Sequence, residues 1–259
     1  MKHIITPSLL ALSGLFLSLP AQGQVLENLF TVDEDKAETY LDAGGAVLYR
    51  PGYLGSDDNV TQLIPYIDGE YKGRFYLKPG QGAGINVINN KYIRLSGGVN
   101  YLFGRDSSEN DTAQSFGLQD IDGSITAAAA LRINTPIGVI DTQYQQPISG
   151  DLEGYRVDVA AITQWDPTPK LRINPGLRVT FMDEEMINQF YDVPKTITFE
   201  GSGVSSYSAF AAAYYDVTDK WQVIGLVDYA ILDNVLADSP LADRDDGVTA
   251  TLGVAYSFR

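Results

Sequence analysis

Long stretches of strict two-residue alternation constrain the fold of this chain more than any other feature of its sequence. In residues 93–101 every odd position is apolar or glycine. The same alternation runs through residues 171–181 and 248–258. A period of two places successive side chains on opposite faces of a strand, so each stretch predicts a strand with one apolar face.

A soluble β-sandwich would give the same local signal, but three features favour a membrane barrel. The alternating stretches run for about 10–13 residues, whereas strands in globular proteins average about 5–6. The face opposite the apolar one is polar or small, which suits a lumen better than a water-exposed sheet. Aromatic residues gather at the ends of the stretches, as in an interfacial girdle. They are Tyr40, Tyr101, Phe103, Trp165, Phe181, Trp221, Tyr256 and Phe258.

The alternation and the turn residues together predict an all-β fold, a transmembrane antiparallel β-barrel of about twelve strands. The expected strands are 40–50, 60–71, 73–79, 82–88, 91–103, 120–133, 137–146, 152–165, 170–182, 204–217, 220–232 and 247–258. An even number places both ends on the periplasmic side. The tight connections then fall on that side, and the long ones at 51–59, 104–119, 183–203 and 233–246 fall outside. Pro65 and Pro175 lie inside strands, where a missing N–H donor predicts a bulge.

The first residues predict a secretory signal. Lys2 and His3 precede an apolar run over residues 9–19, and Ala21-Gln22-Gly23 is a cleavage box of small residues. We expect a signal peptide at 1–23, a polar periplasmic lead-in at 24–39 and a barrel at 40–259. No later apolar run approaches the 18 residues or so of a membrane helix.

Composition removes most enzyme classes. The chain has no cysteine, and its single histidine is His3, inside the predicted signal peptide. Thiol nucleophiles, thiolate zinc sites, Ser-His-Asp triads and histidine-ligated metals are therefore not expected. A net charge of −15 argues against nucleic acid as a partner. We expect a protein that is not an enzyme and that needs no cofactor or metal.

Charged residues on the polar face of the strands are the candidate lumen residues. They are Arg94, Asp122, Arg132, Arg156, Asp158, Arg172, Arg178 and Asp228. They could line a pore or a small-ligand pocket, or they could fill the barrel as inward ion pairs. Acidic clusters in the outer loops could bind divalent cations that bridge lipopolysaccharide, or could be solvated. We favour the ion pairs and the solvated loops.

Several segments resemble the MipA/OmpV family, that of the MltA-interacting protein. The first is the run GGAVLYRPGYLGSDD at 44–58, and the others are the residues around 65–77, 101–106, 117–122 and 238–241. The resemblance implies an outer-membrane protein of a Gram-negative envelope. In the namesake it implies a scaffold that joins a lytic transglycosylase to a penicillin-binding protein. No catalytic residue is carried over.

The last strand is similar to the signal that the barrel assembly machinery reads in outer-membrane proteins. Gly253, Tyr256 and Phe258 carry that similarity, although Arg259 follows the aromatic residue on which the signal usually ends.

Three functions remain open at this point. The first is a non-enzymatic scaffold that contacts peptidoglycan-remodelling machinery through the periplasmic turns and residues 24–39. The second is a small passive pore, cation-preferring because its outer loops are acidic. The third is a surface adhesin that acts through the loops at 104–119 and 183–203.

Overall fold

The computed structural model describes residues 39–107, 111–191, 193 and 203–258. The predicted signal peptide and nearly all of the predicted lead-in lie outside these residues and stay predictions. The described strands are β1 (Tyr40–Pro51), β2 (Asn59–Tyr71), β3 (Phe75–Lys78), β4 (Gly82–Asn89), β5 (Ile93–Leu102), β6 (Ser124–Thr135), β7 (Gly138–Pro147), β8 (Arg156–Ile162), β9 (Trp165–Thr168), β10 (Leu171–Met182), β11 (Gly203–Asp216), β12 (Trp221–Leu232) and β13 (Asp246–Ser257). The described helices are α1 (Asp111–Ser115), α2 (Glu184–Tyr191) and α3 (Asn234–Ala237).

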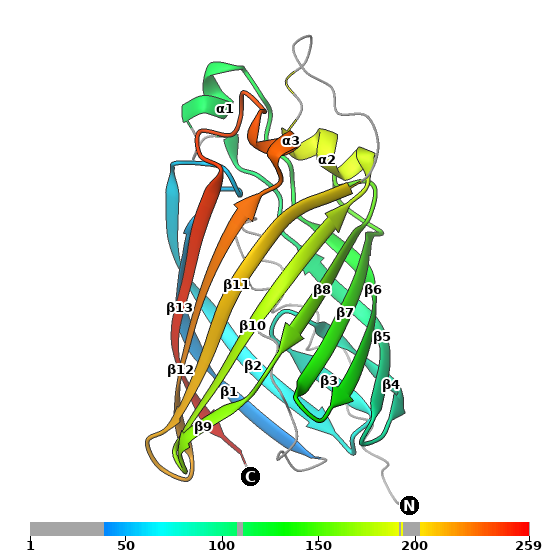
Figure 1. Ribbon diagram of the computed structural model, residues 1–259, viewed down its shortest axis with the longest axis vertical. Coiled ribbons are helices and arrows are strands. Elements are labelled where there is room, and N and C mark those ends of the chain that lie inside the picture. The colour runs from blue at the N-terminus through cyan, green and yellow to red at the C-terminus, as the bar shows by residue number, and fades with distance from the viewer. Residues whose placement is uncertain (1–38, 108–110, 192, 194–202, 259) are drawn as a thin grey trace, which may run out of the picture.

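The strands close into an antiparallel barrel (Figure 1). Apart from β8 and β9, each strand pairs with its neighbour along the chain, and β1 pairs with β13 to complete the ring. Strands β8 and β9 follow one another along the same side of β10, so they occupy one position between them. The ring therefore has twelve positions, which confirms the predicted fold class and strand number.

The interruption between β8 and β9 lies opposite Pro175. Gly176 pairs with Ile162 and Ile173 pairs with Trp165, and no ladder pair joins the strands between these two. Proline has no N–H to donate, which accounts for the local break in the ladder. The bulge predicted at Pro65 is wrong, because β1 and β2 keep their register through the Gly45–Pro65 pair.

Side chains alternate between an exposed apolar outer face and a buried inner face. In β12, for example, Val227 and Tyr229 are exposed whereas Leu226 and Asp228 are buried. The exposed apolar belt includes Leu41, Val47, Leu63, Ile85, Leu95, Val99, Ile125, Leu131, Leu177, Val248, Leu252 and Val254. An outer surface of this kind is compatible with lipid and not with water.

The two ends of the barrel differ. All three helices lie at one end, and the start of β1 and the end of β13 lie at the other (Figure 1). We call these the outer end and the periplasmic end. The connections at the periplasmic end are tight. Residues 72–74, for example, join β2 to β3, and Lys72 and Gly73 have φ of 54° and 62°, as the central residues of a type I′ turn do.

In the short β3–β4 hairpin, β3 is three residues shorter than the predicted strand 73–79, and β4 is one residue longer than the predicted strand 82–88. Its turn does not reach the outer end, because the Gly80 carbonyl accepts hydrogen bonds from the side chains of Asn100 and Gln143 on the inner face of the wall. These inward contacts explain why this outer connection is short while most of the others are long.

The hydrophobic core lies inside the barrel. The Phe210 ring occupies the space beside Gly176, where an added Cβ would lie 2.4 Å from the ring. The buried interior cluster comprises Tyr66, Val139, Ala160, Ile162, Phe210, Ala212, Tyr214, Ile224, Leu226 and Ala255. We call this cluster the middle layer. No helix of the described residues is long and apolar enough to cross a membrane.

Candidate functional site: the barrel interior and its outer cap

Four charged side chains meet inside the barrel near its outer end. Arg156 and Asp158 lie two residues apart on β8, Arg178 lies on β10 and Asp228 on β12. Because each occupies an inward position of its strand, the period of two brings them together. All four are buried. We call this group the charged tetrad.

The tetrad is joined by short contacts. Arg156 Nη2 donates to Asp158 Oδ1 over 2.9 Å, and Arg178 Nη2 donates to Asp228 Oδ2 over 2.8 Å. Arg178 Nε lies 3.9 Å from Asp158 Oδ1, which links the two pairs. Thr180 adds a hydroxyl donor to Asp158 at 2.7 Å.

Two arginines and two aspartates give the tetrad no formal net charge. Buried charges persist only when they are paired and hydrogen-bonded, and this group meets that condition. A ring of one sign of charge, as in a selective channel, would instead leave an uncompensated field. The tetrad therefore stabilises the barrel by joining β8, β10 and β12 from the inside.

A small cavity lies beside the tetrad. It measures about 40 Å³, which is room for a few water molecules. Arg156, Arg178, Asp228 and Thr249 line it from below, and Tyr53 and Leu54 line it from the outer end. A drug-sized ligand needs about 300 Å³ or more, so this space fits water or a small ion.

Two further ion-paired groups lie lower in the barrel. Glu70 Oε2 lies 3.2 Å from Lys78 Nζ and 3.7 Å from Arg94 Nη1. Arg132 Nε lies 2.8 Å from Asp141 Oδ2, its direct cross-strand partner. The first group joins β2, β3 and β5 inside the barrel. The second joins β6 and β7.

The eight predicted lumen residues do not form one site. Arg156, Asp158, Arg178 and Asp228 come together in the tetrad, whereas Arg94 and Arg132 lie in the two separate groups. Arg172 lies near the periplasmic end, with its Nε 3.4 Å from the half-exposed Asp166. Asp122 lies before β6 begins and is exposed.

The sequence reasoning missed three members of these groups. Glu70, Lys78 and Asp141 occupy buried positions of their strands, two residues or a multiple of two from other buried residues. The period of two could have identified all three. Asp122 was included only because the predicted strand began four residues too early.

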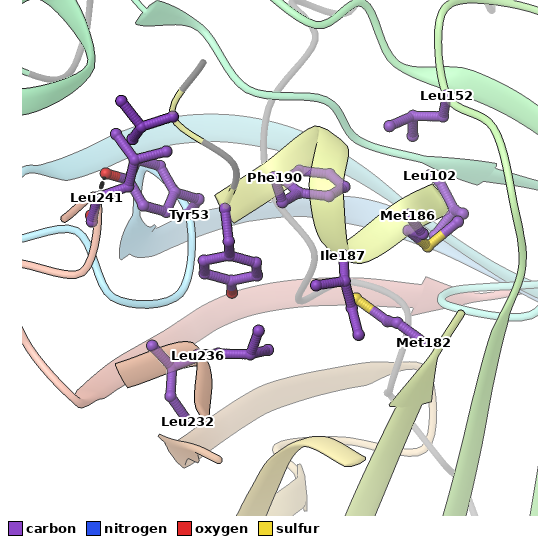
Figure 2. Close-up of a cluster of buried hydrophobic side chains, with 12 residues drawn as sticks. Tyr53, Leu102, Leu152, Met182, Met186, Ile187, Phe190, Leu232, Leu236 and Leu241 are labelled. Atoms are coloured by element: carbon purple, nitrogen blue, oxygen red, sulfur yellow. Dashed lines mark hydrogen bonds between the residues drawn. The ribbon is translucent and has the colours of Figure 1, made fainter. Parts of the chain in front are cut away.

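The outer end carries a hydrophobic cap built from the outer connections (Figure 2). Helix α2 supplies Met186, Ile187 and Phe190, and Figure 2 shows Met186 beside Leu102. Tyr53 from the first connection and Leu236 from α3 belong to the same cluster. We call this cluster the outer cap. Its members are Tyr53, Leu102, Leu152, Met182, Met186, Ile187, Phe190, Tyr191, Val193, Leu232, Leu236 and Leu241.

Buried polar contacts fix the cap connections to one another. Arg105 Nη1 donates to the Phe190 carbonyl over 2.7 Å, and the Arg105 guanidinium lies 5.9 Å from the Tyr53 ring centroid. The Tyr53 hydroxyl donates to the Leu241 carbonyl over 2.6 Å. The Tyr191 hydroxyl donates to the Leu54 carbonyl over 3.1 Å. Residues 85 to 188 positions apart are thus held in one unit.

Ionisation of the cap is suppressed by its burial. Burial raises the pKa of the Tyr53 hydroxyl, and the nearby Asp243 charge adds to the effect. Burial likewise raises the pKa of Tyr191. Burial lowers the pKa of the Arg105 guanidinium, with the neighbouring tyrosines acting in the opposite direction. Both tyrosines therefore stay neutral donors at any physiological pH.

Acidic residues of the outer connections accept hydrogen bonds that stabilise the helices at this end. Asp183 Oδ1 accepts from the N–H of Met186 in the first turn of α2, and Asp233 accepts from the N–H of Val235 to cap α3. Carboxylates stabilise helix N-termini in this way. Asp243 accepts from the Thr112 hydroxyl of α1. Among the described residues no group of three or more acidic, histidine or cysteine side chains is arranged to hold a metal ion.

The residues of the predicted assembly signal lie at the periplasmic end of β13. An added Cβ on Gly253 would lie 2.7 Å from Ala46 Cβ, so glycine permits close approach to β1. The Tyr256 ring lies between Trp221, at 5.1 Å, and Phe258, at 4.9 Å. Two aromatic residues of the predicted girdle, Tyr40 and Phe103, are instead buried. Tyr40 occupies an inward position of β1 and donates its hydroxyl to Asp68.

Comparison with known proteins adds a family. The family model described as MltA-interacting protein MipA matches residues 43–258. The MltA-interacting protein of Escherichia coli K12 is 24% identical over 254 residues, which is 93% of this chain and 99% of that protein. YiaT of the same strain, which carries the name of an outer membrane protein, is 23% identical over 238 residues, 88% of this chain and 94% of YiaT.

Solved structures show a weaker likeness. The NanC porin covers 83% of this chain and 98% of its own, with a TM-score of 0.45 and 11% sequence identity. A likeness of this strength is too low to inform function.

Proposed function

Because this chain belongs to the MipA family and is an outer-membrane β-barrel, we propose that it is a non-enzymatic interaction protein that binds a peptidoglycan-remodelling enzyme at its periplasmic end. The name of the E. coli relative states an interaction with MltA, and a lytic transglycosylase is accordingly the first partner to test. A penicillin-binding protein is the second. The barrel assembly machinery and lipopolysaccharide are expected contacts during insertion and in the membrane.

Layers of buried side chains inside the barrel are the observation that supports this proposal. The outer cap, the charged tetrad and the middle layer follow one another along the axis, and each consists of buried side chains. An interior of this kind leaves the lumen little role in transport. Its exposed periplasmic turns then become the surface that can act on the cell wall.

Ile137 is the natural anchor on that surface. It lies in the tight β6–β7 turn beside Pro136, and its side chain is 87% exposed. A large apolar side chain held at the tip of a rigid hairpin loses little entropy on binding, and such residues often dominate interfaces. Burial of one isoleucine contributes about 1.5–3 kcal/mol.

The test is capture of a purified lytic transglycosylase of the MltA kind by the folded barrel in micelles. We expect Ile137→Asp to weaken capture by about tenfold or more, since the loss of one buried anchor is worth at least 1.4 kcal/mol. Ile148→Asp is the matched control, because Ile148 is 63% exposed in the β7–β8 connection at the opposite end. Undiminished capture by Ile137→Asp would remove this turn from the interface, and no capture by the wild type would remove the partner.

A passive pore is the second candidate, and the charged cavity beside the tetrad favours it. Ions could pass only if the cap and the middle layer moved. Conductance of the folded barrel in a planar bilayer at several salt concentrations tests this function. We expect a silent bilayer; stable steps with cation preference would make the pore the better assignment.

A further inference from the structure

The periplasmic end carries exposed cations, although the chain as a whole is acidic. Lys72 lies in the β2–β3 turn, Lys91 in the β4–β5 turn, Lys170 in the β9–β10 turn and Lys220 in the β11–β12 turn. All four side chains are exposed. The outer connections, in contrast, carry most of the exposed carboxylates. The molecule is therefore electrically polarised along its axis.

Three of these lysines lie over aromatic rings. The distances from ammonium nitrogen to ring centroid are 5.1 Å for Lys72 and Tyr71, 4.7 Å for Lys91 and Tyr92, and 5.7 Å for Lys220 and Tyr256. Cations within about 6 Å of a ring centroid are attracted by the ring. The aliphatic stems of these lysines therefore run along the barrel wall, and their ammonium groups stay near its perimeter.

The rings mark the depth of the membrane boundary. Tyr71 is exposed and pairs across the hairpin with the exposed Phe75. Tyr256 packs between Trp221 and Phe258, which are also exposed. Exposed aromatic residues at strand ends lie at the level of the lipid headgroups. The three ammonium groups are consequently placed at the depth of the phosphates.

The three lysines are spread around more than half of the barrel rim and are available for a new partner. Their rings and turns lie along the contiguous strands from β12 through β13 and β1 to β5. Within the described residues none of the three ammonium groups forms an ion pair. The carboxylate of Asp216, which flanks the Lys220 turn, accepts from Gln222 Nε2 instead.

We propose that the lysine belt, formed by Lys72, Lys91 and Lys220, binds the phosphate groups of anionic phospholipids in the periplasmic leaflet. Lysines beside an anionic membrane surface are attracted to it over about a Debye length. Cations that project away from the membrane would be better placed to bind a protein partner. The belt is distinct from the Ile137 turn and does not depend on the proposed function.

The experiment is native mass spectrometry of the full mature chain in micelles, titrated with phosphatidylglycerol or with phosphatidylcholine. We expect preferential binding of phosphatidylglycerol that weakens as salt rises. We expect about tenfold weaker binding in the triple variant K72Q/K91Q/K220Q and unchanged binding in the matched control K170Q, which lacks a ring contact. The triple variant K72R/K91R/K220R keeps the charges and should keep the binding.

Several outcomes would overturn the proposal. Equal binding of the two lipids by the wild type would exclude an anionic site, and this readout needs no variant. An equal loss of phosphatidylglycerol binding in K170Q would show that the belt acts only through general positive charge. Displacement by millimolar inorganic phosphate would indicate a free-anion site. Loss of transglycosylase capture with unchanged lipid binding would assign the lysines to a protein partner.

Discussion

At the scale of single residues, charge pairing decides how the outer half of the barrel interior is filled. Asp158 is fully buried and contacts both arginines of the tetrad. Asp122, which the sequence grouped with it, is exposed and contacts neither. Two aspartates that look alike in the sequence therefore differ in their burial and in their contacts.

We expect Asp158→Ala to destabilise the barrel by about 3–5 kcal/mol, because it leaves the buried Arg156 and Arg178 short of one carboxylate. Urea unfolding followed by tryptophan fluorescence in micelles measures the change. Asp122→Ala is the matched control and should change the free energy of unfolding by less than about 0.5 kcal/mol. Similar effects of the two substitutions would contradict the structural role of the tetrad.

At the scale of elements, barrel closure depends on how closely β1 approaches β13. Gly44 pairs with Ala255, and an added Cβ on Gly44 would lie 1.8 Å from the Val254 carbonyl oxygen. Backbone atoms cannot give way as a flexible side chain can. Gly225 in the middle of β12 has nothing within 4 Å of the same position.

Gly44→Ala should therefore force β1 and β13 apart and cost about 1–3 kcal/mol, the usual range for overpacking. Gly225→Ala should be neutral or slightly stabilising, because alanine loses less conformational freedom than glycine on folding. The fraction of chain that keeps heat-modifiable mobility on unboiled gels reports closure of the barrel. An equal fraction in the two variants would show that this approach is not limiting.

At the scale of the whole molecule, the cap and the middle layer act as two barriers in series. The cap is built from outer connections, whereas the middle layer is built from the strands themselves. Removing one barrier should leave the other in place. The two barriers can therefore be separated by mutation.

We expect deletion of residues 184–191, which form α2, to loosen the cap while the barrel stays silent in a planar bilayer. Combining that deletion with Phe210→Ala and Tyr66→Ala, which empty part of the middle layer, should give conductance steps. Steps from the single deletion would mean that the middle layer is permeable. Heat-modifiable mobility of each variant confirms that the barrel has folded.

The sequence by itself determined the strands, their number and their faces, because a period of two fixes which side chains share a face whatever lies beyond the strand. The strands predicted at 40–50, 170–182 and 247–258 are observed with ends that differ from the prediction by at most one residue. The same rule placed the four tetrad members on the polar face of their strands, but it did not separate them from the other charged residues predicted there. Only the tertiary structure decided that Asp122 is excluded, that Glu70, Lys78 and Asp141 belong, and that the outer end is capped. Those outcomes depend on contacts between residues distant in the chain, such as Tyr53 with Leu241 and Arg105 with Phe190, and no local pattern encodes such contacts.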